Sequence, residues 1–276
     1  MDKGGISVFK TRLLSGIALV LLALITIISG QIVLWITCLL ISLIGLYELY
    51  QAIGVETAKD KTLAATGYIG VFIYYLILIF EKETYSMISM VFILVLMMAV
   101  YVFTFPKYRS EQVMGTFFGV IYVAVMISYI YQTRMLDDGA FLVWLIFFCS
   151  WGCDTCAYCV GVLFGKHKMA PKLSPKKSVE GAVGGVIGAG LLGAIYAFAV
   201  SGHLASEGNP MIRYALICMV GSLISMVGDL AASAIKRNHQ IKDYGKLIPG
   251  HGGILDRFDS VIFTAPMIYF LATVLA

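Results

Sequence analysis

Ser233–Asp259 reads SAIKRNHQIKDYGKLIPGHGGILDRFD, a stretch dense in charged residues and glycine. It lies between two strongly apolar runs, Met211–Leu230 and Val261–Ala276. Each run is close to the roughly 20 residues that a helix needs to cross the hydrocarbon core of a bilayer. The pattern predicts a site for phosphate groups and a metal ion beside a membrane.

The composition of the whole chain is that of a membrane protein. Hydrophobic residues make up 60% of the 276 residues and charged residues 13%, and the mean hydropathy is +0.90, values that are rare in soluble domains. We therefore expect an all-α, polytopic integral membrane protein, one domain over residues 1–276, with the motif-bearing part at about 150–260. The nine expected spans are Leu13–Ser29, Ile32–Tyr47, Leu63–Phe80, Met87–Phe105, Val113–Tyr131, Phe141–Phe164, Gly181–Val200, Met211–Leu230 and Val261–Ala276.

The basic residues predict the orientation of these spans. Seventeen of the 20 lysines and arginines fall in alternate connecting segments, which would lie on one side of the membrane. Because basic connections stay in the cytoplasm, the N-terminus and both large basic segments are expected there, and the C-terminus outside. Nucleic acid is not expected as a partner, since no nucleic-acid-binding signature is present.

Asp154 is an acidic residue within an apolar run. A carboxylate inside a membrane is costly and tends to be functional, although a packing or internal hydrogen-bonding role is the alternative. Its neighbours Cys153, Cys156 and Cys159 recur at three-residue spacing on one side of the expected helix. We interpret these thiols as small packing residues and not as a metal site. The glycines of Gly181–Val200 likewise indicate close helix packing.

The connection that follows Phe164 is strongly basic. Its cations could hold a triphosphate or a lipid phosphate, and the alternative is an ordinary basic loop at the membrane surface. The candidate substrate-binding residues here are Lys166, Lys172, Ser174, Lys176 and Lys177.

Asp229 lies at the end of the eighth expected span. Offsets of four and seven residues place Ser233 and Lys236 on its helical face, so a carboxylate, a hydroxyl and an ammonium would line up at the cytoplasmic boundary. The alternative is a helix-end charge paired with Lys236 or Arg237.

A second acidic pair, Asp256 and Asp259, flanks Arg257 on one side of a helical turn. Carboxylates from separate segments suit Mg²⁺, which binds one or two of them and completes its shell with water and phosphate. We expect Mg²⁺ on Asp229 and Asp256, and a second cation stays open. Asp259 would bind metal indirectly or orient Arg257, with a plain intrahelical ion pair as the alternative.

His251 lies among glycines just before the acidic pair. Gly252 and Gly253 allow the backbone to approach a phosphate closely, next to a helix N-terminus that favours an anion. We interpret His251 as a phosphate or nucleotide contact, with proton transfer as the weaker alternative.

These motifs together resemble the signature of the phosphatidate cytidylyltransferases, also called CDP-diacylglycerol synthases. The likeness covers Asp154 to Asp259. It rests on Ser233-x-x-Lys236-Arg237-x4-Lys242-Asp243 and on Pro249-x-His251-Gly252-Gly253-x-x-Asp256-Arg257-x-Asp259. Upstream, Asp154-Thr-Cys-Ala-Tyr158 is similar to the family's Asp-Thr-Ala-Ala-Tyr, and Ser174-Pro-Lys-Lys-Ser178-x-Glu180-Gly181 to its Ser-Pro-x-Lys-Thr-x-Glu-Gly.

The resemblance implies the reaction of CTP with phosphatidic acid to give CDP-diacylglycerol and pyrophosphate, in phospholipid biosynthesis. It implies an all-helical homodimer among membrane lipids, in a bacterial plasma membrane, with the active site facing the cytoplasm. The expected catalytic residues are Asp229, Lys236, Arg237, His251, Asp256 and Asp259. Ser233, Lys242, Asp243, Gly252, Gly253 and Arg257 join Asp154 and the basic loop as expected substrate-binding residues.

Three other functions stay open on the sequence. An ether-lipid cytidylyltransferase or a polyprenol kinase would also use CTP at a membrane and need similar residues. A non-enzymatic transporter is less favoured, because transporter sites lie near the bilayer midplane and the charges here gather at one face.

Overall fold

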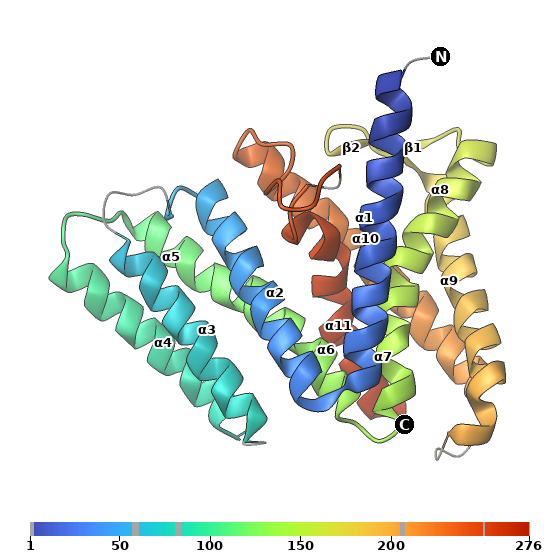
Figure 1. Ribbon diagram of the computed structural model, residues 1–276, viewed down its shortest axis with the longest axis horizontal. Helices are drawn as coiled ribbons and strands as arrows, with labels where there is room; N and C mark the ends of the chain where they lie inside the picture. Colours follow the sequence, from blue (N-terminus) through green and yellow to red (C-terminus); the bar gives the residue numbers. More distant parts are fainter. Residues whose placement is uncertain (1–2, 57–60, 81–83, 205–207, 251, 276) are drawn as a thin grey trace. The chain divides into compact units, whose positions relative to one another are not determined.

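The computed structural model describes residues 3–56, 61–80, 84–204, 208–250 and 252–275, with the backbone alone at 3–13 and 84. Figure 1 shows that nearly all of these residues are helical. The elements are α1 (Lys3–Ser29), α2 (Gln31–Ala52), α3 (Thr62–Ile79), α4 (Thr84–Phe103), α5 (Ser110–Gly119), η1 (Val120–Val125), α6 (Met126–Arg134), α7 (Gly139–Phe147), η2 (Phe148–Gly152), α8 (Cys153–Phe164), β1 (Lys168–Ala170), β2 (Ser174–Ser178), α9 (Val179–Val200), η3 (Ser201–His203), α10 (Pro210–Asn238) and α11 (Leu255–Leu275).

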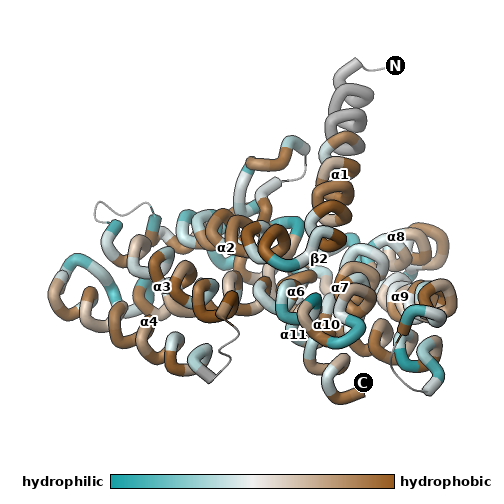
Figure 2. Tube along the Cα trace, turned by 60° about the horizontal axis from the view of Figure 1, so that its bottom comes forward, coloured by the Kyte–Doolittle hydropathy of each residue, from teal (hydrophilic) through white to brown (hydrophobic). Residues whose placement is uncertain are grey.

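Eight helical segments among the described residues are long and apolar enough to cross a membrane. Figure 2 shows the hydrophobic colour running along the helices and the hydrophilic colour gathering in the connections. The prediction of an all-α, polytopic integral membrane protein is confirmed. The first predicted span, Leu13–Ser29, is helical as part of α1, but its apolar portion, Leu14–Ser29, is shorter than the other eight.

Two of the long segments change helix type partway. The π-helical turns η1 and η2 join α5 to α6 and α7 to α8, so Ser110–Arg134 and Gly139–Phe164 each form one continuous segment. Such π-helical turns often mark functional positions. The second turn, η2, ends two residues before Asp154.

The described chain forms two compact units, each made of two stretches of sequence. Unit 1 contains Met1–Ser128 and His239–Arg257, and unit 2 contains Tyr129–Asn238 and Phe258–Ala276. Helix α11 therefore begins in unit 1 and continues in unit 2. The prediction of one domain over the whole chain stays a prediction.

Unit 1 is built around α2, which packs against α3 and η1. Its interior contains polar side chains whose hydrogen bonds are satisfied internally, as a membrane interior requires. Trp35 Nε1 donates to the carbonyl of Tyr75 over 2.9 Å, and the Tyr75 hydroxyl lies 2.8 Å from that of Ser42. The buried Tyr50 hydroxyl donates to the carbonyl of Thr116 over 2.9 Å. These bonds hold α2 against α3 and the segment that begins with α5.

Unit 2 is organised by α9, which packs against both α8 and α10. The approach to α8 is close: a Cβ atom on Gly185 would lie 2.9 Å from Cys153 Sγ, and one on Gly188 would lie 2.6 Å from Cys156 Sγ. The predicted packing role is confirmed for these two glycines and for Cys153 and Cys156, whereas Cys159 is exposed. The basic connection between α8 and α9, predicted as a loop, contains the antiparallel hairpin β1–β2.

Candidate functional site

Unit 2 gathers three of the predicted carboxylates into one group, which we call the carboxylate cluster: Asp154 from α8, Asp229 from α10 and Asp259 from α11. The Asp259 carboxylate interacts electrostatically with those of Asp229 and Asp154 and with the Lys236 ammonium. Asp229 Oδ2 forms an ion pair with Lys177 Nζ of β2. The structure thus brings together residues that lie more than 100 positions apart in the sequence.

Helices α10 and α11 approach each other closely beside this cluster. A Cβ atom on Gly228 would lie 3.0 Å from the carbonyl oxygen of Asp259 and 2.9 Å from the Phe263 ring. The absence of a side chain at Gly228 therefore lets the two helices meet at Asp229 and Asp259. Because α10 is one continuous helix to Asn238, Ser233 follows Asp229 by about one turn and Lys236 by about two, on the same face.

Lys177 differs from the other lysines of the basic connection. Its side chain is 24% exposed and pairs with Asp229, whose side chain is 23% exposed, whereas Lys166, Lys172 and Lys176 are exposed. Neighbouring residues of a strand point to opposite faces, which separates Lys176 from Lys177. Sequence reasoning grouped these lysines because it predicted a loop at this position and not a strand.

The Ser174–Gly181 motif has a structural role at the start of α9. Ser178 is buried, and its hydroxyl accepts the N–H of Gly181 over 3.1 Å as the helix N-cap. The Glu180 carboxylate accepts the N–H of Lys166 over 3.0 Å and lies 2.6 Å from His167 Nδ1. These bonds tie the hairpin to α9 and so hold Lys177 at the cluster. Ser174 is half-buried at the other end of β2.

Most of the remaining predicted residues belong to the segment Asp243–Arg257 of unit 1, which we call the signature loop. Lys242 directly precedes this segment, and Arg237 lies in α10. Asp256 is 5% exposed, and its Oδ2 accepts the N–H of Tyr244 over 2.8 Å and of Gly253 over 3.0 Å. The N–H of Ile248 donates to the carbonyl of Gly252 over 2.8 Å, and Gly252 takes a left-handed φ of 85°. The Asp256 carboxylate thus holds the two ends of this turn together.

The other signature residues differ in exposure. Lys242 and Asp243 are exposed, Arg237 is exposed at the end of α10, and Arg257 is half-buried. Gly253 is buried, and its N–H donates to the Asp256 carboxylate. The prediction for His251 lies outside the described residues.

Sequence reasoning missed Glu48, a buried carboxylate of α2 that contacts the signature loop within unit 1. Its two oxygens accept the N–H groups of Ile254 and Leu255 over 3.0 and 2.8 Å. An acidic residue at the end of an apolar span was the available signal, because such groups are costly to bury without a partner.

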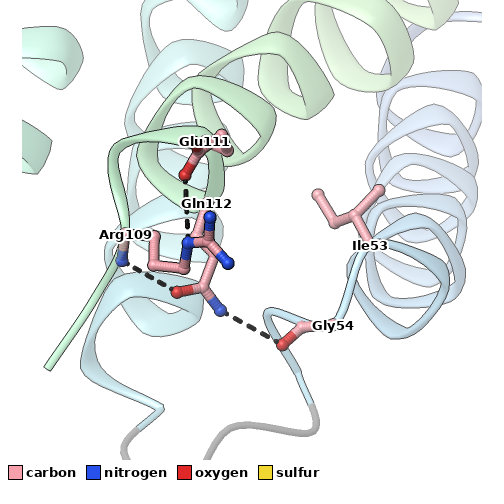
Figure 3. A pocket seen from close by; sticks show the side chains of 5 residues that line it. All are labelled: Ile53, Gly54, Arg109, Glu111 and Gln112. Carbon is pink, nitrogen blue, oxygen red and sulfur yellow. Dashed lines mark hydrogen bonds and ion pairs between the residues drawn. The ribbon is translucent and has the colours of Figure 1, made fainter.

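A cavity of about 370 Å³ in unit 1 is lined by Ile53, Gly54, Arg109, Glu111 and Gln112. Figure 3 shows the Gln112 side chain linking two segments there. Its oxygen accepts the backbone N–H of Arg109 over 3.0 Å, and its nitrogen donates to the carbonyl of Gly54 over 3.5 Å. This cavity contains none of the predicted site residues.

Comparison with known proteins identifies relatives over almost the whole chain. The model of the cytidylyltransferase family matches residues 10–275. The phosphatidate cytidylyltransferase of Bacillus subtilis (strain 168) is 32% identical over 271 residues, which cover 95% of this chain and 97% of the relative. That of Staphylococcus epidermidis (strain ATCC 12228) is 31% identical over 267 residues, covering 95% and 98%.

A third relative matches over a shorter length. The phosphatidate cytidylyltransferase of Rickettsia felis is 34% identical over 156 residues, which cover 56% of this chain and 68% of the relative. The family match includes both the carboxylate cluster and the signature loop. This chain belongs to the cytidylyltransferase family.

Proposed function

We propose that this protein transfers the cytidylyl group of CTP to phosphatidic acid, giving CDP-diacylglycerol and pyrophosphate for phospholipid synthesis. Relatives that match nearly end to end carry the name of that activity. The observation that supports it most strongly is the carboxylate cluster, where Asp229 and Asp259 face the ammonium groups of Lys177 and Lys236. Such a mixed site can hold both a metal ion and phosphate groups.

The reaction joins two anions, so the work of the side chains is mainly electrostatic. An oxygen of the phosphatidate phosphate attacks the α-phosphorus of CTP in line, a new P–O bond forms, and the bond to the β-phosphate oxygen breaks to release pyrophosphate. Phosphatidate is already ionised, so a strong general base is unnecessary. Lys236 and Arg237 would offset the charge that develops on the transferred and leaving oxygens.

The cluster fits a hard divalent cation by the chemistry of its donors. No group of three His, Cys, Asp or Glu side chains in the described part of the chain already has the arrangement of a metal site. Mg²⁺, however, usually takes only one or two protein carboxylates and keeps water and phosphate oxygens. Asp229 would hold it, with Asp259 and Asp154 adding negative charge, and Asp256 remains the second predicted ligand. Bound Mg²⁺ would neutralise phosphate charge; a second cation stays open.

A single assay decides the reaction. Purified protein in mixed micelles is incubated with CTP labelled in the cytidine, with and without phosphatidic acid. We expect lipid-dependent release of pyrophosphate and a labelled lipid product. Release of CDP with a polyprenol acceptor would indicate a kinase, a product only with an unsaturated ether lipid would indicate the ether-lipid enzyme, and transport without turnover would indicate a carrier.

Substitutions of Lys177 and Lys176 form a matched pair, because Lys177 contacts the carboxylate cluster and Lys176 is exposed. Because Lys177 pairs with Asp229, Lys177→Met should lower kcat by about tenfold or more, as expected when a contact to the reacting groups is lost. Lys176→Met, on the exposed side of β2, should raise the KM for phosphatidate by about two- to fivefold, with kcat within a factor of about two. Steady-state kinetics with each substrate varied measures both. Equal effects of the two substitutions would contradict this division.

We also propose that the site faces the cytoplasm of a bacterial plasma membrane, where CTP is available. The support is the distribution of basic residues on the two sides of the predicted spans. With the exposed Cys159 replaced, single cysteines at Lys176 and Lys246 should react only with reagent that reaches the cytoplasm, and a cysteine at Asp137 only with external reagent. External labelling at position 176 would overturn the orientation.

We also propose a homodimer, which the family resemblance supports. Cross-linking in native membranes tests it.

A further inference from the structure

Glu48 is a buried acid that the proposed mechanism does not use. It lies in α2, one of the N-terminal helices, and is only 4% exposed. Burying a carboxylate without partners is strongly unfavourable, so its partners indicate its role. Within unit 1, the partners that hydrogen-bond to Glu48 are backbone groups of the signature loop.

Those partners are the N–H groups at the start of α11. Glu48 Oε1 accepts from Ile254 over 3.0 Å, and Oε2 accepts from Leu255 over 2.8 Å. The first N–H groups of a helix have no acceptor within the helix, and the helix dipole favours an anion at this end. Glu48 therefore caps α11 from a position more than 200 residues earlier in the chain.

The signature loop leaves room for this carboxylate. A Cβ atom on Gly245 or on Gly253 would overlap the Glu48 carboxylate group. Neither glycine has a left-handed φ, so the close approach of Glu48, and not the turn, requires their lack of a side chain. Gly253, which the sequence suggested for phosphate contact, faces Glu48 instead.

Asp256 completes the arrangement. Glu48 holds the N–H groups of Ile254 and Leu255, while Asp256 holds those of Tyr244 and Gly253. Two carboxylates thus hold Tyr244 and the three consecutive residues Gly253–Leu255, where α11 begins. The first turn of α11 carries Asp256 and Arg257. A small shift of this turn would move both side chains together.

We propose that Glu48 is a positioning residue for cytidylyl transfer, setting the place of the signature loop through the backbone of Ile254 and Leu255. This gives the N-terminal helix α2 a part in the reaction that its apolar sequence does not reveal. The proposal rests on the proposed function, and its test therefore includes a measurement that needs no turnover.

The first test compares Glu48→Gln with Glu56→Gln. Glu56 is a matched control, because it is also a buried acid of unit 1, 9% exposed, but is bound by Lys61 over 2.8 Å and Tyr68 over 3.0 Å. Its hydrogen bond raises the pKa of Lys61 above the ordinary value. Glutamine at position 48 keeps the shape but turns an NH₂ group toward one of the two N–H donors.

Glu48→Gln should lower kcat by about ten- to 100-fold with the KM for CTP and phosphatidate within about threefold, since a misplaced group costs rate more than binding. Hydrogen exchange should be faster in the peptide containing residues 244–256 and unchanged in the rest of α11. Glu56→Gln should change neither quantity. Equal kcat and equal exchange in the two variants would overturn the proposal, whereas absent turnover in the unmodified protein would overturn only the proposed reaction.

A second test uses Gly245, where added volume can be compensated. Gly245→Ala should lower kcat because the methyl group meets the Glu48 carboxylate. Glu48→Asp withdraws that carboxylate by one methylene, about 1.5 Å. The double variant should be more active than Gly245→Ala alone, as expected for residues in direct contact. Losses that simply multiply would contradict the proposal, and this comparison decides the matter even if Glu48→Gln fails to accumulate.

Discussion

Asp229→Asn should lower turnover by about 100- to 1,000-fold while the protein still inserts and folds, because an amide is a poor replacement for the carboxylate that we propose as a Mg²⁺ ligand and that pairs with Lys177. Activity of the unmodified protein should disappear with EDTA and return with Mg²⁺. The measurement is the initial rate of pyrophosphate release as Mg²⁺ is varied, with monodispersity in detergent as the check on folding.

Asp137→Asn is the matched control for Asp229, since Asp137 is an exposed acid in the connection between α6 and α7. It should leave the rate unchanged. If Asp229→Asn kept near-normal turnover at low Mg²⁺, Asp229 would not be a ligand, and its ion pair with Lys177 would be structural.

Asp256 is expected to show the second large effect, and two substitutions separate its possible roles. Asparagine keeps an oxygen that can accept the N–H groups of Tyr244 and Gly253, so Asp256→Asn removes mainly the charge. Alanine removes both the charge and these hydrogen bonds. We expect each variant to lose about 100-fold or more in turnover, because a predicted metal ligand needs its charge.

The pattern of the two losses is the informative result. If Asp256→Asn stayed close to the unmodified rate while Asp256→Ala lost most of it, Asp256 would serve only to hold the signature loop. The same exchange measurement on residues 244–256 provides the control, since Asn should protect the loop and Ala should not.

Most of the helical fold could be predicted from hydropathy alone. Eight of the nine predicted spans correspond to helices long and apolar enough to cross the membrane, because apolar length is a property of the local sequence. The first apolar helix has the predicted position but a shorter apolar portion, and its polar N-terminal continuation is also helical. The β1–β2 hairpin could not be predicted, since only three and five residues form its strands and their pairing depends on α9.

The candidate site could be predicted in its residue types but not in its contacts. The sequence spacing predicted that Ser233 and Lys236 share a helical face with Asp229, because all three residues belong to one helix, α10. The ion pair of Lys177 with Asp229 joins two elements about 50 residues apart, and the bonds of Glu48 join elements about 200 apart. Such contacts depend on tertiary packing, about which a single sequence contains little information.

The tight contact between α8 and α9 affects how precisely Asp154 is positioned in the carboxylate cluster. Cys153 precedes Asp154 directly and meets Gly185 with no space for even one more carbon atom. Helices that are already surrounded by lipid gain no hydrophobic stabilisation when they associate. Shape complementarity of this kind therefore determines how they pack together. The contact between Cys153 and Gly185 therefore limits how far the Asp154 backbone can shift within unit 2. Where Asp154 lies is decided by atoms that take no part in charge, metal binding or proton transfer.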